Sequence, residues 1–171
     1  GRSAQALRGR AFQQDVTRSM DDVNSQYLTG SDVGVSRTRN PGQGEVVFPD
    51  QLIFEQPPAS IRPGTGRSVR YRPLAQATAT SNKSRDFARR AGDRLQSDLA
   101  NVRQQVVEDV QELFDKYSGR VYIRRRGHAL FNQRVTVSEV VLVYDQRLVP
   151  PDLVTMIQTT AAAEARRLNP S

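Results

Sequence analysis

The chain has 171 residues, a formal net charge of +7 at pH 7 and no cysteine, which excludes disulfides, thiolate metal sites and a cysteine nucleophile. Its length fits one domain of ordinary size, or a smaller domain with a long appendage. Hydrophobic residues make up 37%, which predicts a modest core, and the longest apolar run, Val140 to Tyr144, is far shorter than the ~18 residues of a membrane span.

The first stretch, residues 1–28, has the spacing of an amphipathic helix. Its apolar residues recur at steps of 4, 4, 3 and 4, which puts them on one stripe of a helix: Phe12, Val16, Met20, Val23 and Tyr27. An isolated helix of this length is marginal in water, so we expect the stripe to pack on another surface. The first residues lack the apolar core of a signal peptide, and we expect no membrane partner.

The second stretch, residues 29–81, contains six of the nine prolines and six of the eleven glycines. Both residue types interrupt regular elements, so only short extended pieces are predicted, at residues 45–48, 51–54 and 68–71. The stretch is nevertheless too apolar for a typical disordered linker. We interpret it as a long extended arm that becomes ordered on a partner subunit, with these interface anchors: Phe48, Leu52, Ile53 and Phe54.

The third stretch, residues 82–171, is predicted to be a compact α+β module. Apolar residues at a mean step of 3.75 predict one long helix over residues 82–117: Phe87, Ala91, Leu95, Leu99, Val102, Val106, Val110, Leu113 and Tyr117. Strands follow over residues 120–147, where residues 134–144 are rich in β-branched side chains. A helix over residues 151–168 closes the chain. The predicted fold is α+β: an N-terminal helix, an extended arm, a long helix, a small antiparallel sheet or hairpin, and a C-terminal helix.

No arrangement of residues in the sequence indicates an enzyme. The single histidine, His128, follows a glycine at a predicted turn, and one histidine without cysteine can hardly supply a zinc site. There is no nucleophile-elbow motif, and the glycine pairs at positions 42–44 and 64–66 lack the rest of a phosphate-binding loop. The carboxylates of Glu108, Asp109, Glu112 and Asp115 are predicted to form a solvated acidic face. We expect no catalytic residue, metal or cofactor.

The positive charge is concentrated in two segments. Residues 62–94 hold nine basic and two acidic residues, and residues 120–134 hold five arginines and no acidic residue. Arginine suits phosphates and carboxylates because its planar guanidinium binds them in a bidentate manner. The predicted binding residues for nucleic acid or an acidic partner are Arg62, Arg67, Arg70, Tyr71, Arg72, Arg85, Arg89, Arg90, Arg94, Arg120, Arg124, Arg125 and Arg126.

Together these features predict a non-enzymatic structural or assembly protein of a large multi-subunit particle, with a virion (a tailed-phage head, neck or tail) as the particle. We expect a homo-oligomer that contacts its own copies and other subunits, located in the virion or, before assembly, in the cytoplasm. One alternative is a stand-alone nucleic-acid-binding protein that uses the Arg62–Arg94 and Arg120–Arg126 patches. Another is a chaperone-like or secretion-apparatus protein. Salt-sensitive binding to a generic duplex separates the first alternative from an assembly protein.

Overall fold

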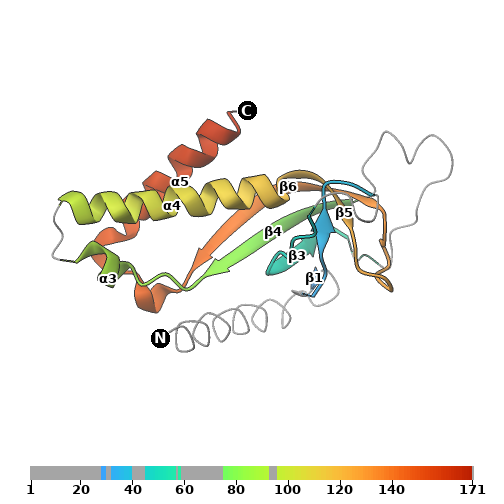
Figure 1. Ribbon diagram of the computed structural model, residues 1–171, viewed down its shortest axis with the longest axis horizontal. Coiled ribbons are helices and arrows are strands. Elements are labelled where there is room, and N and C mark those ends of the chain that lie inside the picture. The colour runs from blue at the N-terminus through green and yellow to red at the C-terminus, as the bar shows by residue number, and fades with distance from the viewer. Residues whose placement is uncertain are drawn as a thin grey trace. The chain divides into compact units, whose positions relative to one another are not determined.

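The computed structural model describes most of the chain from residue 28 onward (Figure 1). The described residues are 28–29, 32–39, 45–56, 58, 75–92 and 96–170, with the side chains of 28–29 and 96–98 left out. They divide into two compact units. Unit 1 comprises residues 82–115 and 142–170, and unit 2 comprises the described residues of 28–81 together with residues 116–141. Of the helix predicted over residues 1–28, residues 1–27 lie outside the described residues, and Leu28 belongs to a strand.

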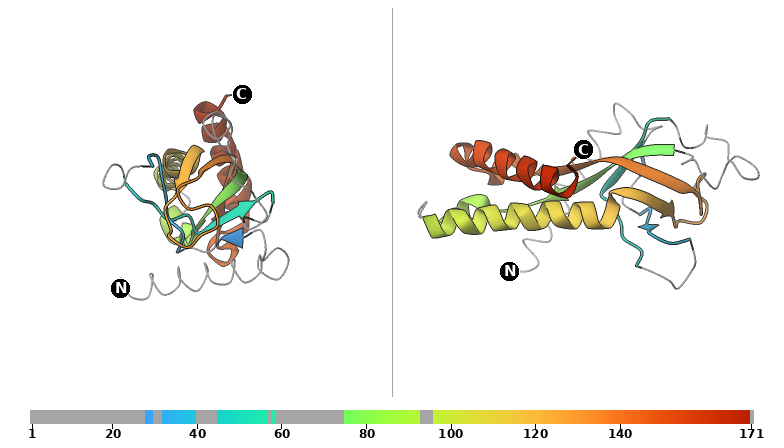
Figure 2. Two further views of the ribbon diagram at one scale, coloured as in Figure 1. Left: turned by 90° about the vertical axis from the view of Figure 1, so that its right-hand side faces the viewer. Right: turned by 90° about the horizontal axis from the view of Figure 1, so that it is seen from above.

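One mixed, curled β-sheet contains all the strands of the described residues (Figure 2). The six strands lie in the order β1-β3-β4-β6-β5-β2. Their bounds are β1 Leu28–Thr29, β2 Val35–Ser36, β3 Gln51–Phe54, β4 Ala75–Lys83, β5 Gly119–Ile123 and β6 Arg134–Tyr144. The pairs β1–β3, β3–β4, β5–β6 and β2–β5 are antiparallel. The last residues of β4 and β6 lie together, because the amide of Asp145 donates to the carbonyl of Lys83 at 3.2 Å, so these two central strands run parallel.

The extended arm predicted over residues 29–81 is wrong where the structure describes it, because β2, β3 and most of β4 come from this stretch and belong to the chain's own sheet. Residues 30–31, 40–44, 57 and 59–74 lie outside the described residues. In the register of β3 on β4, Leu52 lies opposite Ala79 and Phe54 opposite Ala77, and all four side chains are buried. Prolines and glycines keep these strands short, as expected. Their hydrogen-bonding partners come from the same chain.

The expected small antiparallel sheet or hairpin is also wrong, because β4 and β6 join shorter strands on both sides into one larger mixed sheet. β4 continues through residue 81, where the sequence suggested that the arm ends. Its residues alternate, so that Ala75, Ala77 and Ala79 are buried on one side. Alanine is depleted in strands, and three small side chains give a weak periodic signal. The strand predicted over residues 134–144, by contrast, is confirmed as β6.

The long helix predicted over residues 82–117 is two helices in the structure. Residues 82–83 end β4, α3 spans Phe87–Ala91 and α4 spans Gln96–Tyr117. The carboxylate of Asp86 caps α3 by accepting a hydrogen bond from the amide of Arg89 at 3.1 Å. Gly92 ends α3 with φ of 51°, a left-handed conformation that favours glycine. The apolar stripe itself was predicted correctly where the structure describes it, since Leu99 is half-buried and the other described members are buried. Leu95 lies outside the described residues.

The core of unit 1 lies between its helices. Two 3-10 turns, Gln146–Leu148 and Pro151–Leu153, lead into α5 (Val154–Leu168), which confirms the closing helix. Residues of α3, α4, the second turn and α5 form one buried cluster: Phe87, Ala91, Val102, Val106, Val110, Leu153 and Ile157. The ring of Tyr144 meets the ring of Phe87 edge-on, with centroids 4.9 Å apart. Such edge-to-face pairs add to the stability gained from burial.

Replacing Leu52 tests whether residues 51–54 belong to this fold. Leu52 is 1% exposed, so Leu52→Ala should lower the free energy of unfolding by about 2–5 kcal/mol, measured by urea denaturation of the isolated protein. Phe48→Ala is the matched control, because Phe48 is 56% exposed and its loss should cost less than about 1 kcal/mol. Equal, small effects of both changes would instead support an arm that is ordered only by a partner.

Candidate interaction surfaces

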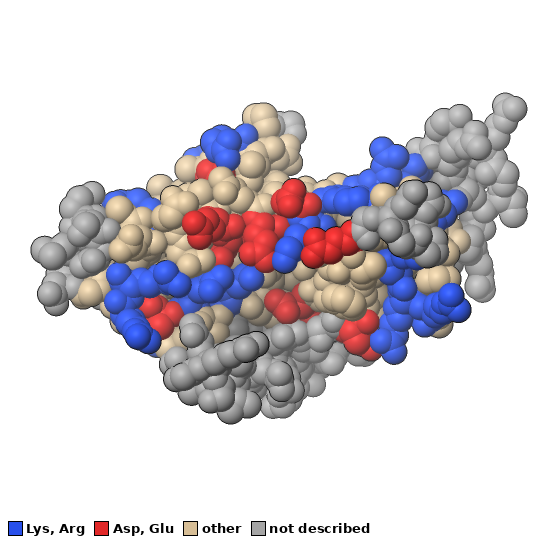
Figure 3. Space-filling view, viewed as in Figure 1, with Lys and Arg blue, Asp and Glu red and all other residues tan. Residues whose placement is uncertain are grey.

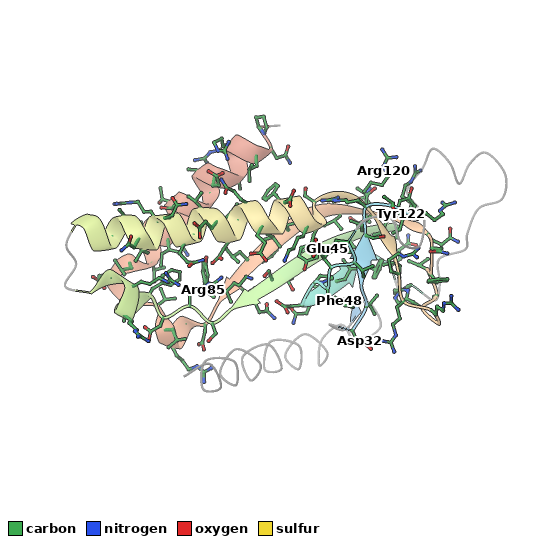
Figure 4. The ribbon with its side chains drawn as sticks, in the orientation of Figure 1. Asp32, Glu45, Phe48, Arg85, Arg120 and Tyr122 are labelled. Atoms are coloured by element: carbon green, nitrogen blue, oxygen red, sulfur yellow. The ribbon has the colours of Figure 1, made fainter. Side chains whose placement is uncertain are left out.

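Pairing of β2 with β5 in unit 2 gathers arginines from two distant parts of the sequence. The register places Val35 opposite Ile123 and Ser36 opposite Tyr122, so the segments after β2 and around β5 lie side by side. Figure 3 shows basic side chains collected around the β5 end of the sheet, and Figure 4 labels Arg120 and Tyr122 there. We call this group the arginine surface; it consists of Arg37, Arg39, Arg120, Arg124, Arg125 and Arg126.

Strand alternation decides which side chains of β5 reach this surface. Val121 and Ile123 are fully buried, whereas Arg120 is exposed and Tyr122 is half-buried. Successive side chains of a strand point to opposite faces, so Arg120 and Tyr122 share the face away from the buried one. The guanidinium of Arg39 lies over the Tyr122 ring, 5.3 Å from its centroid. This cation–π contact holds Arg39 beside β5.

Two of the arginines hold the surface together by binding backbone carbonyls. Arg37 donates from Nη1 to the carbonyls of Ser118 at 2.7 Å and Arg120 at 3.0 Å. Arg124 donates from Nη1 to the carbonyl of Arg39 at 2.7 Å, and its backbone amide donates to the carbonyl of Gly34 at 2.8 Å. These bonds join segments more than 80 positions apart in the chain. The surface is therefore a built feature of unit 2.

The remaining arginines differ in how their charge is balanced. Arg125 forms an ion pair with Asp32, and both side chains are largely exposed. Arg39, Arg120 and Arg126 are exposed, and they form no ion pair with a carboxylate among the described residues. Like charges gathered on one surface repel one another. The surface thus carries an excess of positive charge that an external anion can neutralise.

The structure brings together only part of the predicted binding set. Arg120, Arg124, Arg125 and Arg126 meet in the arginine surface, as their sequence run suggested. Arg89 and Arg90 are exposed on α3 of unit 1. Six further members of the predicted set lie outside the described residues: Arg62, Arg67, Arg70, Tyr71, Arg72 and Arg94. Sequence reasoning missed Arg37 and Arg39, because only the pairing of β2 with β5 places them beside Arg120.

Among the proposed interface anchors, the structure exposes one and buries two. Phe48 is 56% exposed, whereas Leu52 and Phe54 are buried in unit 2; Ile53 is half-buried. Val47 pairs with Val35 through two backbone hydrogen bonds of 2.8 and 2.9 Å, so residues 46–48 lie along β2 at the end of the sheet. We call Val46, which is 42% exposed, and Phe48 the edge patch.

Gly34 allows the edge patch to lie flat on the backbone. A Cβ atom at position 34 would stand 2.5 Å from Cγ1 of Val46 and 3.0 Å from the Phe48 ring. Real side chains do not tolerate the shorter of these distances, so glycine is required here by close approach. Both apolar side chains of the edge patch therefore lie over one residue of the sheet, next to each other and open to solvent.

A buried polar cluster in unit 1 accounts for Arg85 and Asp109. Asp109 is 2% exposed, which corrects its expected place on a solvated face; its neighbours Glu108, Glu112 and Asp115 are exposed as expected. Arg85 donates to both carboxylate oxygens at 2.9 and 3.2 Å. The carboxylate also accepts hydrogen bonds from Tyr144 at 2.8 Å and Gln105 at 2.9 Å. A buried charge with this many donors is well compensated.

The cluster changes the pKa values of Tyr144 and Arg85. Burial, together with the charge and hydrogen bond of Asp109, raises the pKa of Tyr144 well above its ordinary value, so its hydroxyl remains a donor. Burial alone would lower the pKa of Arg85, but the bonds and charge of Asp109 outweigh it and raise that pKa. The cluster is therefore a stable ion pair within the fold. Arg85 is engaged there, although the sequence suggested it for an external partner.

An open groove of about 390 Å³ lies beside this cluster in unit 1. Its lining comes from β6, the 3-10 turn that follows and α5: Leu142, Tyr144, Gln146, Val149, Val154, Ile157 and Gln158. Most of these side chains are apolar. The titratable residue of the lining is Tyr144, and its hydroxyl is engaged by Asp109. The groove therefore presents no activated nucleophile or base.

His128 shapes the turn that carries the end of the arginine surface. Its Nδ1 accepts a hydrogen bond from the amide of Leu130 at 3.0 Å, and its carbonyl accepts one from the amide of Phe131 at 3.0 Å. Leu130 is fully buried, and the His128 ring lies 6.1 Å from the ring of Phe54. Burial, and then the charge of Arg125, lower the pKa of His128 below its ordinary value of 6.5. The neutral ring thus organises the turn.

In comparisons with known proteins, no protein-family model, curated protein or solved structure matches this chain. Within the described residues, no group of three or more histidine, aspartate or glutamate side chains could hold a metal ion. In that same part of the chain, every helix is too short or too polar to cross a membrane.

Replacing Asp109 tests the buried ion pair. Asp109→Ala should lower the free energy of unfolding by about 3 kcal/mol in urea denaturation, because it leaves the half-buried Arg85 without its counter-ion. Glu108→Ala, at the next and exposed position of α4, should change it by less than about 0.5 kcal/mol. If the two variants were equally stable, Asp109 would belong to a solvated face after all.

The pH dependence of stability tests the role of His128. Because its pKa is lower in the folded protein, the unfolded chain binds more protons just below pH 6.5, so stability should fall as the pH is lowered through that value. His128→Asn keeps an acceptor for the Leu130 amide but removes the titration. Since the chain has a single histidine, urea denaturation at several pH values above 5 should show a weaker pH dependence in this variant. Identical profiles would contradict the assignment.

Proposed function

We propose that the protein is a non-enzymatic subunit of a multi-subunit particle and that the edge patch contacts a second copy of the chain. The observation that carries this proposal is the exposure of Val46 and Phe48 next to each other at the end of the sheet (Figure 4 labels Phe48). Isolated exposed apolar residues are common on soluble proteins, but adjacent ones mark contact sites.

The edge patch is prepared for binding, because its backbone is already ordered. Val47 is held on Val35 by paired hydrogen bonds, and Gly34 leaves room for both apolar side chains. Little conformational entropy remains to be lost when a neighbour covers them. Burying an exposed Phe or Val side chain contributes up to about 2–3 kcal/mol. Two edge patches related by a two-fold axis would each cover the other, which is how identical subunits form a closed contact.

The polar arrangements of the described residues support a structural role. Asp109 is engaged by Arg85, Tyr144 and Gln105, and His128 is engaged by a turn amide, so each group serves the fold. The extended arm has no role in this assembly, since its described segments lie in the chain's own sheet. Assignment of the particle to a virion stays a prediction from the sequence.

The oligomeric state tests this function. Light scattering of the purified wild-type protein should show a defined oligomer, and Val46→Thr with Phe48→Gln should shift it toward the monomer at the same protein concentration. The matched control is Val154→Thr with Leu168→Gln, which changes two large hydrophobic residues of unit 1 that are each 36% exposed among the described residues. This control should keep the wild-type oligomer.

Two results would contradict the proposal. One is a wild-type protein that remains a monomer across the accessible range of concentrations. The other is a loss of the oligomer that is equal in the edge-patch variant and in the control, since this would show a general effect of surface hydrophobicity. Circular dichroism spectra of both variants verify that the fold is retained.

A further inference from the structure

We propose that the arginine surface binds the phosphate backbone of a nucleic acid, an activity that goes beyond subunit assembly. The surface lies wholly in unit 2, where the pairing of β2 with β5 brings Arg37 and Arg39 beside Arg120 and the run of residues 124–126. Its members are exposed or half-buried, so their charge is accessible. A ligand with closely spaced negative charges is the chemical complement of such a surface.

The arginine surface gathers positive charges that repel one another. The backbone contacts of Arg37 and Arg124 hold like charges together, although their mutual repulsion opposes this arrangement. Asp32 compensates Arg125, but Arg39, Arg120 and Arg126 form no ion pair among the described residues. A bound polyanion would relieve this repulsion and release its own counter-ions. We therefore expect an anionic ligand to neutralise the excess positive charge of the free protein.

The chemistry of the guanidinium group also suits a phosphate ligand. The cationic groups of the surface are all guanidinium groups, which bind phosphate oxygens through two parallel hydrogen bonds and lose less hydration than ammonium groups. Arg39 lies against the ring of Tyr122 at 5.3 Å and Arg124 against the ring of Phe131 at 5.9 Å, so both are held in place before a ligand arrives. Preorganisation of this kind reduces the entropy lost on binding.

A nucleic acid fits this surface better than an acidic protein does. Arg39, Arg120 and Arg126 are exposed and form no ion pair among the described residues, so they offer several guanidinium groups to a ligand with closely spaced phosphates. A nucleic acid carries one phosphate on every nucleotide, whereas carboxylates on a protein surface alternate with other side chains. Because guanidinium contacts to phosphates carry no base information, the binding is expected to be independent of sequence and strongly weakened by salt.

The test uses fluorescence anisotropy with a labelled generic DNA duplex and its labelled single strand, each titrated with the full chain over a series of salt concentrations. The test variant is Arg39→Gln, Arg120→Gln and Arg126→Gln, which removes charge but keeps the backbone contacts of Arg37 and Arg124 and the ion pair of Arg125 with Asp32. The matched control removes the same charge from exposed arginines of unit 1, by Arg89→Gln, Arg90→Gln and Arg166→Gln.

Wild-type protein should bind with an affinity that falls steeply as salt rises. The test variant should bind at least about tenfold more weakly at low salt, and the slope of log affinity against log salt should become shallower by about 2–3, as three phosphate contacts are lost. The control should stay close to wild type on both measures. Tighter binding to one of the two probes identifies the form of nucleic acid that the surface prefers.

Several outcomes would overturn the proposal. An equal loss in the test variant and the control would mean that net charge alone attracts the probe. Equally tight, equally salt-sensitive binding of poly-glutamate would assign the surface to an acidic protein partner. If the test variant lost its oligomer but kept nucleic-acid binding, the surface would belong to the contact between copies. The edge-patch variant Val46→Thr with Phe48→Gln should bind the probes as wild type does, which separates this proposal from the proposed assembly role.

Discussion

The pairing of β4 with β6 is the constraint on which the sheet depends. It joins β1-β3-β4, built from residues before position 84, to β6-β5-β2, most of which comes from residues after position 118. Parallel neighbours need a long crossover connection, and α3, α4 and β5 supply it here. Without this ladder β1-β3-β4 would be a separate piece in which β1 adds only two residues to the β3–β4 pair, and an isolated pair of strands is marginally stable at best in water. Both candidate surfaces rest on the sheet that the ladder completes.

In unit 2, strand β2 lies between the apolar edge patch and the arginine surface. On β2, the backbone of Val35 bonds Val47, which presents the edge patch, while Ser36 lies opposite Tyr122 at the centre of the arginine surface. This two-residue strand thus supports both an apolar patch and a cationic surface. A particle subunit that binds both its own copy and a nucleic acid needs two such surfaces, chemically distinct so that neither ligand competes for the other's place.

Local patterns predicted the elements that need no distant partner, and failed where strands depend on one. The apolar stripe of α4, the β-branched run of β6 and the proline-started closing helix were readable because each carries its own periodic signal. β4 (AQATATSNK) and the two-residue β2 carry almost none, so Pro- and Gly-rich neighbours suggested an arm. The same holds for the candidate site. The run Arg124–Arg126 could be predicted from the sequence, whereas Arg37 and Arg39 lie beside it only because of the register of β2 on β5. Arg85 was predicted to bind a partner, but it binds the buried Asp109 instead.

Hydrogen exchange of the isolated protein tests the central claim most directly, because it reports whether β4 is paired on both sides without any partner. The backbone amides of residues 77–80 in β4 should exchange as slowly as those of residues 106–110 in the buried part of α4. Exchange of β4 at the rate of an unprotected chain, while α4 remains slow, would show that the sheet does not form in the protein alone and would contradict this account.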